Sequence, residues 1–286
     1  ARACQWESRC WAPAEPNPPR EGHASVKIDI LSSAGGRSSG YLLRHDDAAV
    51  LVDCGPGTAV SLARSGWLER LGAVIITHEH ADHAADIIGL AYARRFPDPL
   101  PRIPLLAPAS ALAVLRRLDD LFAVPTLPQM AHTIRASFEL GALGMDGVPA
   151  MVARRLQLTS YPALHAVPSA ALRFSSAHQT VAFSSDTGAC DALIEAASNA
   201  DLFLCEATYL AASAAELDRH GHLTAELAAA TASRAGVRQL VLTHLARAGD
   251  ATAALTAASR HFKIASTTVA VPGTTISAKP LQLPPW

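Results

Sequence analysis

The 286-residue chain carries little charge and no excess of one sign. Only 17% of its residues are charged, and 24 Lys and Arg stand against 25 Asp and Glu. Binding to a long nucleic acid by counterion release needs clustered Lys and Arg, which this balance does not favour. The composition therefore favours a small or compact substrate. The length is sufficient to bury a sizeable core.

Long hydrophobic runs are also absent. Half of the residues are hydrophobic, but no run approaches the roughly 20 apolar residues that cross a bilayer. We therefore expect a soluble protein with no membrane partner. Residues 1–22 are rich in Pro, lack hydrophobic periodicity and do not follow a secretory signal pattern. They are predicted to form a flexible N-terminal arm, with residues 23–286 as a single domain.

Cysteine is scarce, and its spacing does not suggest a disulfide framework. The chain has five Cys residues, Cys4, Cys10, Cys54, Cys190 and Cys205. An odd number without tight spacing favours a reducing compartment, and we expect the cytoplasm. Cys4 and Cys10 could still pair with each other.

The densest group of metal-binding side chains lies in the segment from Thr77 to His83. Within six positions it holds His78, His80, Asp82 and His83. An apolar run at 72–76 precedes it and a predicted helix follows, and α/β proteins often place their chemistry at such a strand exit. Imidazole and carboxylate groups suit Zn²⁺, although Mn²⁺ and Fe accept the same ligands. The segment therefore predicts a metal-binding loop.

Hydrophobic periodicity predicts alternating runs of strands and helices. Strands are expected over 26–31, 41–44, 48–53, 152–159, 171–175, 180–184, 201–205, 239–243, 267–271 and 275–277. Helices are expected over 59–65, from the metal-binding loop to about 96, and over 109–122, 189–198, 224–235 and 250–262. Residues 123–150 are expected to be mostly strand and loop. The two halves, 26–122 and 152–278, each predict a sheet with helices outside it, which together make a two-sheet sandwich.

Three more potential metal ligands stand at or near the ends of predicted strands, namely His165, Asp186 and His244. Each has an ordinary alternative, since a lone His is commonly a core or surface residue and an Asp before Thr-Gly commonly makes a turn. Their shared position at strand ends is what a site along one sheet edge requires.

The motif Gly36-Arg37-Ser38-Ser39-Gly40 matches the G-x-S-x-G pattern of nucleophilic serines. That turn needs a strand before it and a helix after it. A strand is expected to follow here, so a hairpin loop is favoured and Ser38 at most lines a pocket.

Together, the His78-x-His80-x-Asp82-His83 signature, His165, Asp186 and His244 resemble the metallo-β-lactamase superfamily. Within it they resemble the branch that holds ribonuclease Z and related phosphodiesterases. The resemblance implies an α+β fold, a four-layer αββα sandwich, with two divalent metal ions that are usually zinc. It implies one metal held by His78, His80 and His165, and a second held by Asp82, His83 and His244. Asp186 would bridge the two metals.

Two further segments, Cys205-Glu206-Ala207-Thr208 and Gly221-His222-Leu223-Thr224, resemble sequences of the same branch. The resemblance implies that His222 donates a proton or stabilises phosphate and that Glu206 orients its ring. On the residues alone, Glu206 could equally face a helix, and His222 could simply precede a helix cap. Asp53 aligns with an Asp that would orient a ligand histidine, although a turn role is equally open.

The chain departs from the family pattern in two places. Ser185 stands where the family usually has Gly before the bridging Asp. The interval between His165 and Asp186 is too short for the long tRNA-clasping arm that ribonuclease Z carries there. For that reason tRNA is not the expected substrate.

The expected function is that of a dinuclear metal-dependent hydrolase, acting as a phosphodiesterase on a small or cyclic phosphodiester. Metal-bridged hydroxide would attack phosphorus, Asp82 would orient this nucleophile, and His222 would assist the leaving alkoxide. A homodimer is a further expectation, by analogy alone.

Three alternatives remain open. The same metals could cleave a carboxylic ester, lactone or thioester, in which case loss of His222 would matter little. A di-iron oxygen or nitric-oxide reductase is disfavoured, because that subfamily generally has Glu where this chain has His80 and carries a flavin module. A non-catalytic, metal-stabilised binding domain is disfavoured because all the expected ligands are present.

Overall fold

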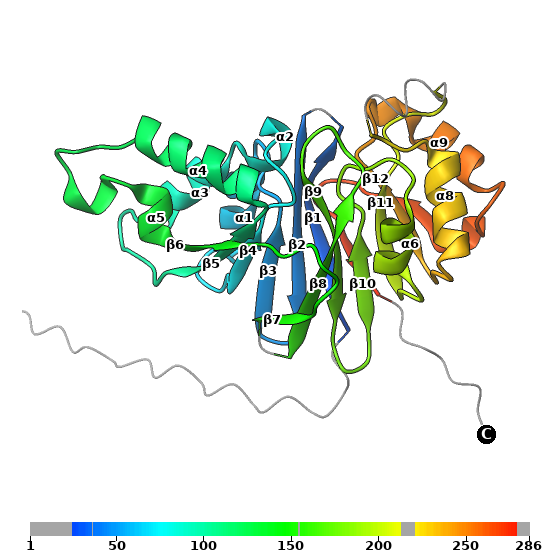
Figure 1. The fold of residues 1–286 in the computed structure, drawn as a ribbon, viewed down its shortest axis with the longest axis horizontal. Coiled ribbons are helices and arrows are strands. Elements are labelled where there is room, and N and C mark those ends of the chain that lie inside the picture. Colours follow the sequence, from blue (N-terminus) through cyan, green and yellow to red (C-terminus); the bar gives the residue numbers. More distant parts are fainter. Residues whose placement is uncertain (1–24, 36, 154, 213–220, 279–286) are drawn as a thin grey trace, which may run out of the picture.

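The structure is a computed structural model that describes residues 25–35, 37–153, 155–212 and 221–278 (Figure 1). The predicted N-terminal arm, with Cys4 and Cys10, lies outside the described residues. Cys54, Cys190 and Cys205 are free thiols, as expected. Among the described residues, no helix is long and apolar enough to cross a membrane.

The described chain forms two seven-stranded sheets that pack face to face. In spatial order, the first sheet contains β14 (Thr275–Ser277), β1 (Lys27–Ala34), β2 (Ser38–His45), β3 (Ala48–Val52), β4 (Ala73–Ile75), β5 (Ile103–Ala107) and β6 (Phe138–Ala142). The second contains β13 (Thr267–Val269), β12 (Leu240–Thr243), β11 (Leu202–Glu206), β10 (Thr180–Phe183), β9 (Ser169–Ser175), β8 (Leu156–Ala163) and β7 (Ala150–Ala153).

Helices cover the outer face of each sheet (Figure 1). The first sheet is covered by α1 (Thr58–Arg64), α2 (Ala81–Ala84), α3 (Ile87–Ala93), α4 (Ala109–Leu121) and α5 (Thr133–Ser137), with a 3₁₀ turn at Pro128–Met130. The second is covered by α6 (Asp191–Ala197), α8 (Ala225–Arg234) and α9 (Ala251–Ala258), with 3₁₀ turns at Ala248–Asp250 and Ile264–Ser266. The predicted αββα sandwich is confirmed.

Three separate apolar layers hold the four structural layers together. Because side-chain direction alternates along a strand, neighbouring residues of one strand belong to different apolar layers. In β3, Val50 and Val52 join the core between the sheets, whereas Ala49 and Leu51 join the core beneath the helices. Successive side chains of a strand point to opposite faces. Every residue of β3 is buried because both of its faces are covered, which explains its uninterrupted apolar sequence.

One expected strand, 152–159, is in fact a hairpin of two strands. β7 and β8 pair in an antiparallel register that shifts between Met151 and Ala153. Arg155 follows with a φ of 58°. The sequence has no Gly, Asn or Pro there to mark the turn. β8 also continues to Ala163, beyond the expected end of the strand at 159.

Two further expectations need correction. The segment 123–150 contains the helix α5, whose start is capped from a distance: the buried Asp119 accepts hydrogen bonds from the backbone N–H of Ile134 (2.8 Å) and from Arg135 Nε (2.7 Å). The segment 275–277 does not extend the second sheet. It pairs with β1 of the first, where Ile28 lies opposite Ile276. Local periodicity cannot reveal either of these long-range partners.

The core between the sheets provides a test of the fold. Phe174 is buried on β9, and its ring centroid lies 5.7 Å from that of Phe183. We expect Phe174→Ala to lower the free energy of unfolding by about 3–5 kcal/mol, because the vacated volume cannot fully collapse. Urea titration followed by circular dichroism measures this. Phe122→Ala, at a side chain that is 48% exposed, is the control and should change it by less than about 0.5 kcal/mol. Equal effects would contradict the assigned core.

Candidate metal centre

The predicted metal ligands come after strands, Glu206 ends β11, and these strand ends meet at one edge of the sandwich, whereas His222 lies just before α8. β3 and β4 are parallel, as are β10, β11 and β12. Parallel strands present their carboxyl ends along the same edge of a sheet. The loop after β4 carries His78 and His80, and α2 directly after it carries Asp82 and His83. The second sheet contributes His165 after β8, Asp186 after β10 and His244 after β12.

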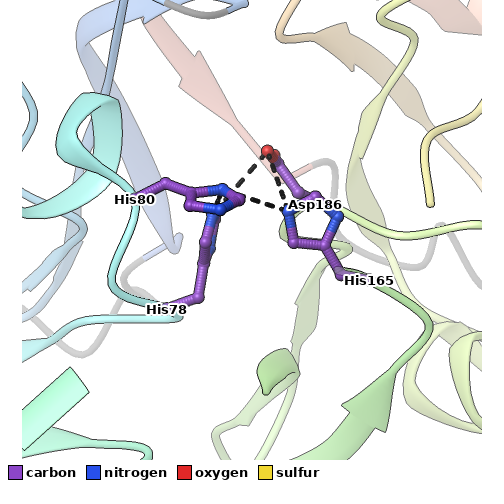
Figure 2. A group of neighbouring side chains, drawn as sticks. All are labelled: His78, His80, His165 and Asp186. Carbon is purple, nitrogen blue, oxygen red and sulfur yellow. Dashed lines mark hydrogen bonds and ion pairs between the residues drawn. The ribbon is translucent and has the colours of Figure 1, made fainter. Parts of the chain in front are cut away.

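The first group of donor atoms comes from His78, His80, His165 and Asp186, whose side chains converge in Figure 2. His80 Nδ1 lies 3.1 Å from His78 Nε2 and 3.2 Å from His165 Nε2. Asp186 Oδ2 lies 3.8 Å from His78 Nε2 and 3.9 Å from His165 Nε2. Four ligands at about 2.1 Å from a tetrahedral Zn²⁺ stand about 3.4 Å apart. The donor set and its spacing fit a zinc-like cation.

The second group comes from Asp82, His83 and His244. His244 Nε2 lies 3.3 Å from Asp82 Oδ2 and 3.4 Å from His83 Nε2. Asp186 reaches this group too, because its Oδ1 lies 3.3 Å from His83 Nε2 and 3.4 Å from His244 Nε2. One carboxylate thus presents one oxygen to each group, as a bridging ligand of two cations would.

Asp53 organises the ligands that come from the first sheet. Its Oδ2 lies 2.8 Å from His83 Nδ1, and its Oδ1 accepts hydrogen bonds from Thr77 N (2.8 Å) and Thr77 Oγ1 (2.9 Å). Thr77 Oγ1 in turn lies 3.2 Å from His78 Nδ1. Hydrogen bonds to the outward nitrogen fix which ring nitrogen faces a metal. Asp53 therefore holds two ligand histidines, one directly and one through Thr77.

The outward nitrogens of the second-sheet histidines are held as well. His244 Nδ1 lies 2.9 Å from Thr208 Oγ1, and His165 Nδ1 donates to the carbonyl of Gly221 (3.0 Å). Gly221 has a φ of 62°, and a Cβ there would stand 2.6 Å from the carbonyl oxygen of Leu164. Only glycine brings this carbonyl so close to His165.

Burial and charge set the protonation of these groups. Burial, with the charge of His83 nearby, holds the pKa of His78 well below its usual value, and burial lowers the pKa of His165. Burial favours a protonated Asp186, but His83 and His244 outweigh it and hold the pKa of that carboxyl well below its usual range. His78 and His165 are therefore uncharged and able to bind a cation, next to an ionised Asp186.

His83 behaves differently. Burial disfavours its charged form, yet the carboxylates of Asp186 and Asp53 raise its pKa well above the usual value. In the metal-free protein it therefore carries a proton between two carboxylates. That proton must leave when His83 binds a cation, so metal binding is coupled to proton release.

His222 and Glu206 form a pair beside both groups of ligands. His222 Nδ1 lies 2.8 Å from Glu206 Oε1, and the His222 ring centroid lies 5.1 Å from that of His165. The buried Glu206 also accepts hydrogen bonds from Thr187 N (2.9 Å) and Thr208 Oγ1 (2.6 Å). Burial disfavours a charged His222, but the hydrogen bond and charge of Glu206 outweigh it and raise its pKa.

Some residues of this arrangement were not expected from the sequence. Thr208 joins Glu206 to His244 through one hydroxyl, and Gly221 acts through a backbone carbonyl. Both lie inside segments already singled out for their Glu and His, but a threonine or a carbonyl gives no metal-site signal of its own. Ser38 begins β2, which pairs with β1 in an antiparallel register, so the predicted hairpin is confirmed. The Ser38 hydroxyl donates a hydrogen bond to the carbonyl of Pro56 (2.8 Å).

A small cavity of about 20 Å³ borders the site between the sheets. Ser39, rather than Ser38, lines it together with Tyr41, Asp53, Asp186 and His244. Burial raises the pKa of Tyr41 to about 12, so this side chain stays neutral. A space of this volume holds about one water molecule. A substrate must therefore approach from the open side of the centre, where Asp82 and His222 are partly exposed.

Comparison with known proteins agrees with this geometry. Residues 48–245 match the family model described as a beta-lactamase superfamily domain. The chain belongs to the metallo-β-lactamase superfamily. It is therefore a member of a family of metallo-hydrolases, with a His and Asp cluster able to hold metal ions.

Individual relatives fit this membership. The uncharacterized protein Rv1339 of Mycobacterium tuberculosis is 32% identical over 239 residues, covering 77% of this chain and 81% of the relative. Ribonuclease Z of Thermobifida fusca is 29% identical over 248 residues, covering 72% and 77%. The crystal structure of the metallo-beta-lactamase fold protein YhfI from Bacillus subtilis superposes with a TM-score of 0.74 at 25% identity, covering 88% of this chain and 99% of that one.

Metal titration tests the bridging role of Asp186. We expect Zn²⁺ to raise the unfolding temperature of the metal-free protein, because an ion that binds only the folded state stabilises it. Asp186→Ala should remove most of this rise, since it takes an oxygen from both donor groups. Asp191→Ala is the matched control, at a side chain that is 95% exposed on α6, and it should keep the full rise. Differential scanning fluorimetry measures both, and a full rise in Asp186→Ala would exclude the bridge.

Proposed function

We propose that the protein is a dinuclear metal-dependent phosphodiesterase that acts on a small or cyclic phosphodiester. The observation that carries this proposal is the combination of a shared carboxylate with an acid–base pair. Asp186 presents one oxygen to each donor group, and the His222–Glu206 pair stands beside both. Zinc is the first choice of metal, and manganese or iron would find suitable ligands in the same residues.

Each of the two donor groups would bind one cation. His78, His80 and His165 would hold one cation and Asp82, His83 and His244 the other, with Asp186 between them. Two bound divalent ions would supply a hydroxide at neutral pH and take up negative charge on the phosphate oxygens. The remaining tasks, orienting that nucleophile and protonating the leaving oxygen, fall to side chains of this chain.

Asp82 would orient the nucleophile. Its side chain is 15% exposed, more than the other carboxylates of the centre, so an arriving water can reach it. Burial disfavours its ionised form, but the hydrogen bond from His244 and the charges of His83 and His244 outweigh it and lower its pKa. Asp82 would therefore accept a hydrogen bond from the attacking water as an ionised group.

His222 would donate the proton. Its Nδ1–H is committed to Glu206, which leaves Nε2–H to face the leaving oxygen. The raised pKa keeps the ring charged to higher pH than an ordinary histidine. A charged ring also attracts the phosphate group, so the pair suits a phosphodiester better than a neutral ester.

A compact substrate is supported by the interval between His165 and Asp186. All of its residues are described, and they form the short hairpin of β9 and β10 with its connecting turns. This hairpin is part of the second sheet and not a projecting arm. The resemblance to a ribonuclease Z therefore does not lead us to propose tRNA as the substrate.

Leaving-group dependence tests the role of His222. For a cyclic nucleotide, whose leaving alkoxide needs a proton, we expect His222→Ala to lower kcat about 10²–10⁴-fold. For bis-p-nitrophenyl phosphate, whose leaving group needs none, the loss should be much smaller. His261→Ala is the control, because His261 pairs with Glu226 at 3.1 Å on the surface. Stopped-assay kinetics with Zn²⁺ and with Mn²⁺ measure these rates.

The same assays separate the competing functions. Asp82→Ala should abolish hydrolysis of every substrate, since it removes a metal ligand as well as the group that orients water. A wild-type enzyme that cleaves lactones or thioesters, and does so equally well as His222→Ala, would replace the phosphodiesterase proposal with an ester hydrolase. Binding of metal without hydrolysis of any of these substrates would indicate a binding domain.

The pH dependence gives an independent test of the pair. A proton donor works only below its pKa, so kcat for an alkoxide-leaving substrate should fall as pH rises through the raised pKa of His222. Glu206→Gln removes the charge that raises this pKa, so the alkaline limb should move to lower pH, towards about 6.5. A pH–rate profile of both proteins measures the shift. An unmoved limb would show that another group titrates.

A further inference from the structure

Three residues other than glycine adopt left-handed backbone conformations at the strand ends that form the site. They are Asp53, Ser185 and His244, with φ values of 61°, 55° and 57°. The conformation is strained for residues with a Cβ, and it often marks function when the structure retains it. Asp53 and His244 use their side chains within the centre. Ser185 is not among the proposed ligands, so its presence where glycine would fit without strain needs a reason.

The hydroxyl of Ser185 lies between two buried partners. Ser185 Oγ is 2.8 Å from Ser169 Oγ and 3.5 Å from His78 Nδ1. Ser169 Oγ in turn donates to the backbone carbonyl of Asp186 at 3.2 Å. The neighbouring Ser184 is occupied elsewhere, because its hydroxyl donates to the Ser185 carbonyl (2.7 Å) and accepts from Glu206 N (2.8 Å).

The hydrogen bonds from His78 through Ser185 and Ser169 to the Asp186 backbone can all run in one direction. His78 faces the donor group with Nε2, so Nδ1 carries the proton once Nε2 binds a cation. Nδ1–H can then donate to Ser185 Oγ, Ser185 to Ser169, and Ser169 to the carbonyl of Asp186. Thr77 Oγ1 is a second acceptor for the same N–H, at 3.2 Å. Every donor along the path has an acceptor, so no buried group is left unsatisfied.

We propose that Ser185 is a positioning residue whose hydroxyl, through Ser169, ties His78 to the backbone of Asp186. The link fixes a ligand of the first donor group relative to the carboxylate that serves both groups. The chain retains a strained serine because its hydroxyl improves metal binding, at the expense of stability in the metal-free protein. This inference rests on the proposed metal-binding roles of His78 and Asp186.

His78 and Asp186 stand at the two ends of this hydrogen-bonded path, and both side chains are sealed from solvent. His78 is 0% exposed and Asp186 4%, and Ser169 is 1% exposed. Ser185 itself is only partly buried and borders the small cavity, so water can compensate in part when its hydroxyl is removed. Outer hydrogen bonds of this kind typically change metal affinity 10–100-fold. Because Thr77 still accepts from His78, we expect the lower end of that range.

Two substitutions of Ser185 separate the hydroxyl from the strain. Ser185→Ala removes the hydroxyl and keeps the Cβ, whereas Ser185→Gly removes both. The metal-free Ser185→Gly protein should unfold roughly 1–3 °C above wild type, because relief of strain exceeds the entropy that glycine adds to the unfolded chain. The metal-free Ser185→Ala protein should show no such gain. Both should bind Zn²⁺ about tenfold more weakly, measured by competition with a chromophoric chelator.

Ser169 provides the second arm of the experiment. Ser169→Ala should weaken Zn²⁺ binding by a similar factor, and the Ser169→Ala/Ser185→Ala double variant should lose little more than either single variant, because both interrupt one path. Ser176→Ala is the control: this serine lies in the β9–β10 turn, where its hydroxyl donates to the carbonyl of Gln179 at 3.2 Å. Its Zn²⁺ affinity should equal that of wild type.

Each other outcome has a distinct meaning. Unchanged Zn²⁺ affinity in Ser185→Ala would overturn the proposal, even if Ser185→Gly lost affinity, because backbone freedom and not the hydroxyl would then be responsible. Fully additive losses in the double variant would also overturn the shared path. Failure of wild type to bind Zn²⁺ would instead reject the proposed metal centre itself, and this inference with it.

Discussion

The carboxylate of Asp186 is the point on which the arrangement of the site depends. The first half of the chain supplies His78, His80, Asp82 and His83, and the second half supplies His165, Asp186 and His244. Neither half brings together a full donor group of its own. The apolar layer between the sheets therefore sets the distances between ligands, because it fixes how the two sheets lie against each other. The packing of the core therefore also determines the geometry of the candidate metal centre.

A second property of the site is that five of its histidines have a hydrogen-bond partner on the ring nitrogen that faces away from the centre. In the first sheet the partners are Asp53 for His83 and Thr77 for His78. In the second half of the chain they are Thr208 for His244, the carbonyl of Gly221 for His165, and Glu206 for His222. These partners fix the ring orientations before any ion arrives. Such preorganisation is what electrostatic catalysis needs, because the groups do not have to reorient during the reaction. The fold delivers Asp53, Thr77, Glu206 and Thr208 at or just after strand ends, and Gly221 from the segment before α8.

The sequence predicted those parts of the molecule whose signals are local. His78, His80, Asp82 and His83 share one loop, and His165, Asp186 and His244 each stand close to the end of an apolar strand. What it could not predict depends on partners far along the chain. Asp119 caps α5 from fifteen residues away, and Ser169 contacts Ser185 from the next strand. Serines and carbonyls carry no metal-site signal, so their roles emerge only when the fold brings them together.

The position of β14 has a consequence for the order in which the protein can form. This strand, Thr275–Ser277, completes the first sheet by pairing with β1 at Lys27–Asp29. During synthesis, the edge of β1 must remain without its partner until almost the whole described chain has left the ribosome. An unpaired edge is a site for unwanted association. The first sheet thus keeps an exposed strand edge until late in synthesis, when such an edge favours aggregation.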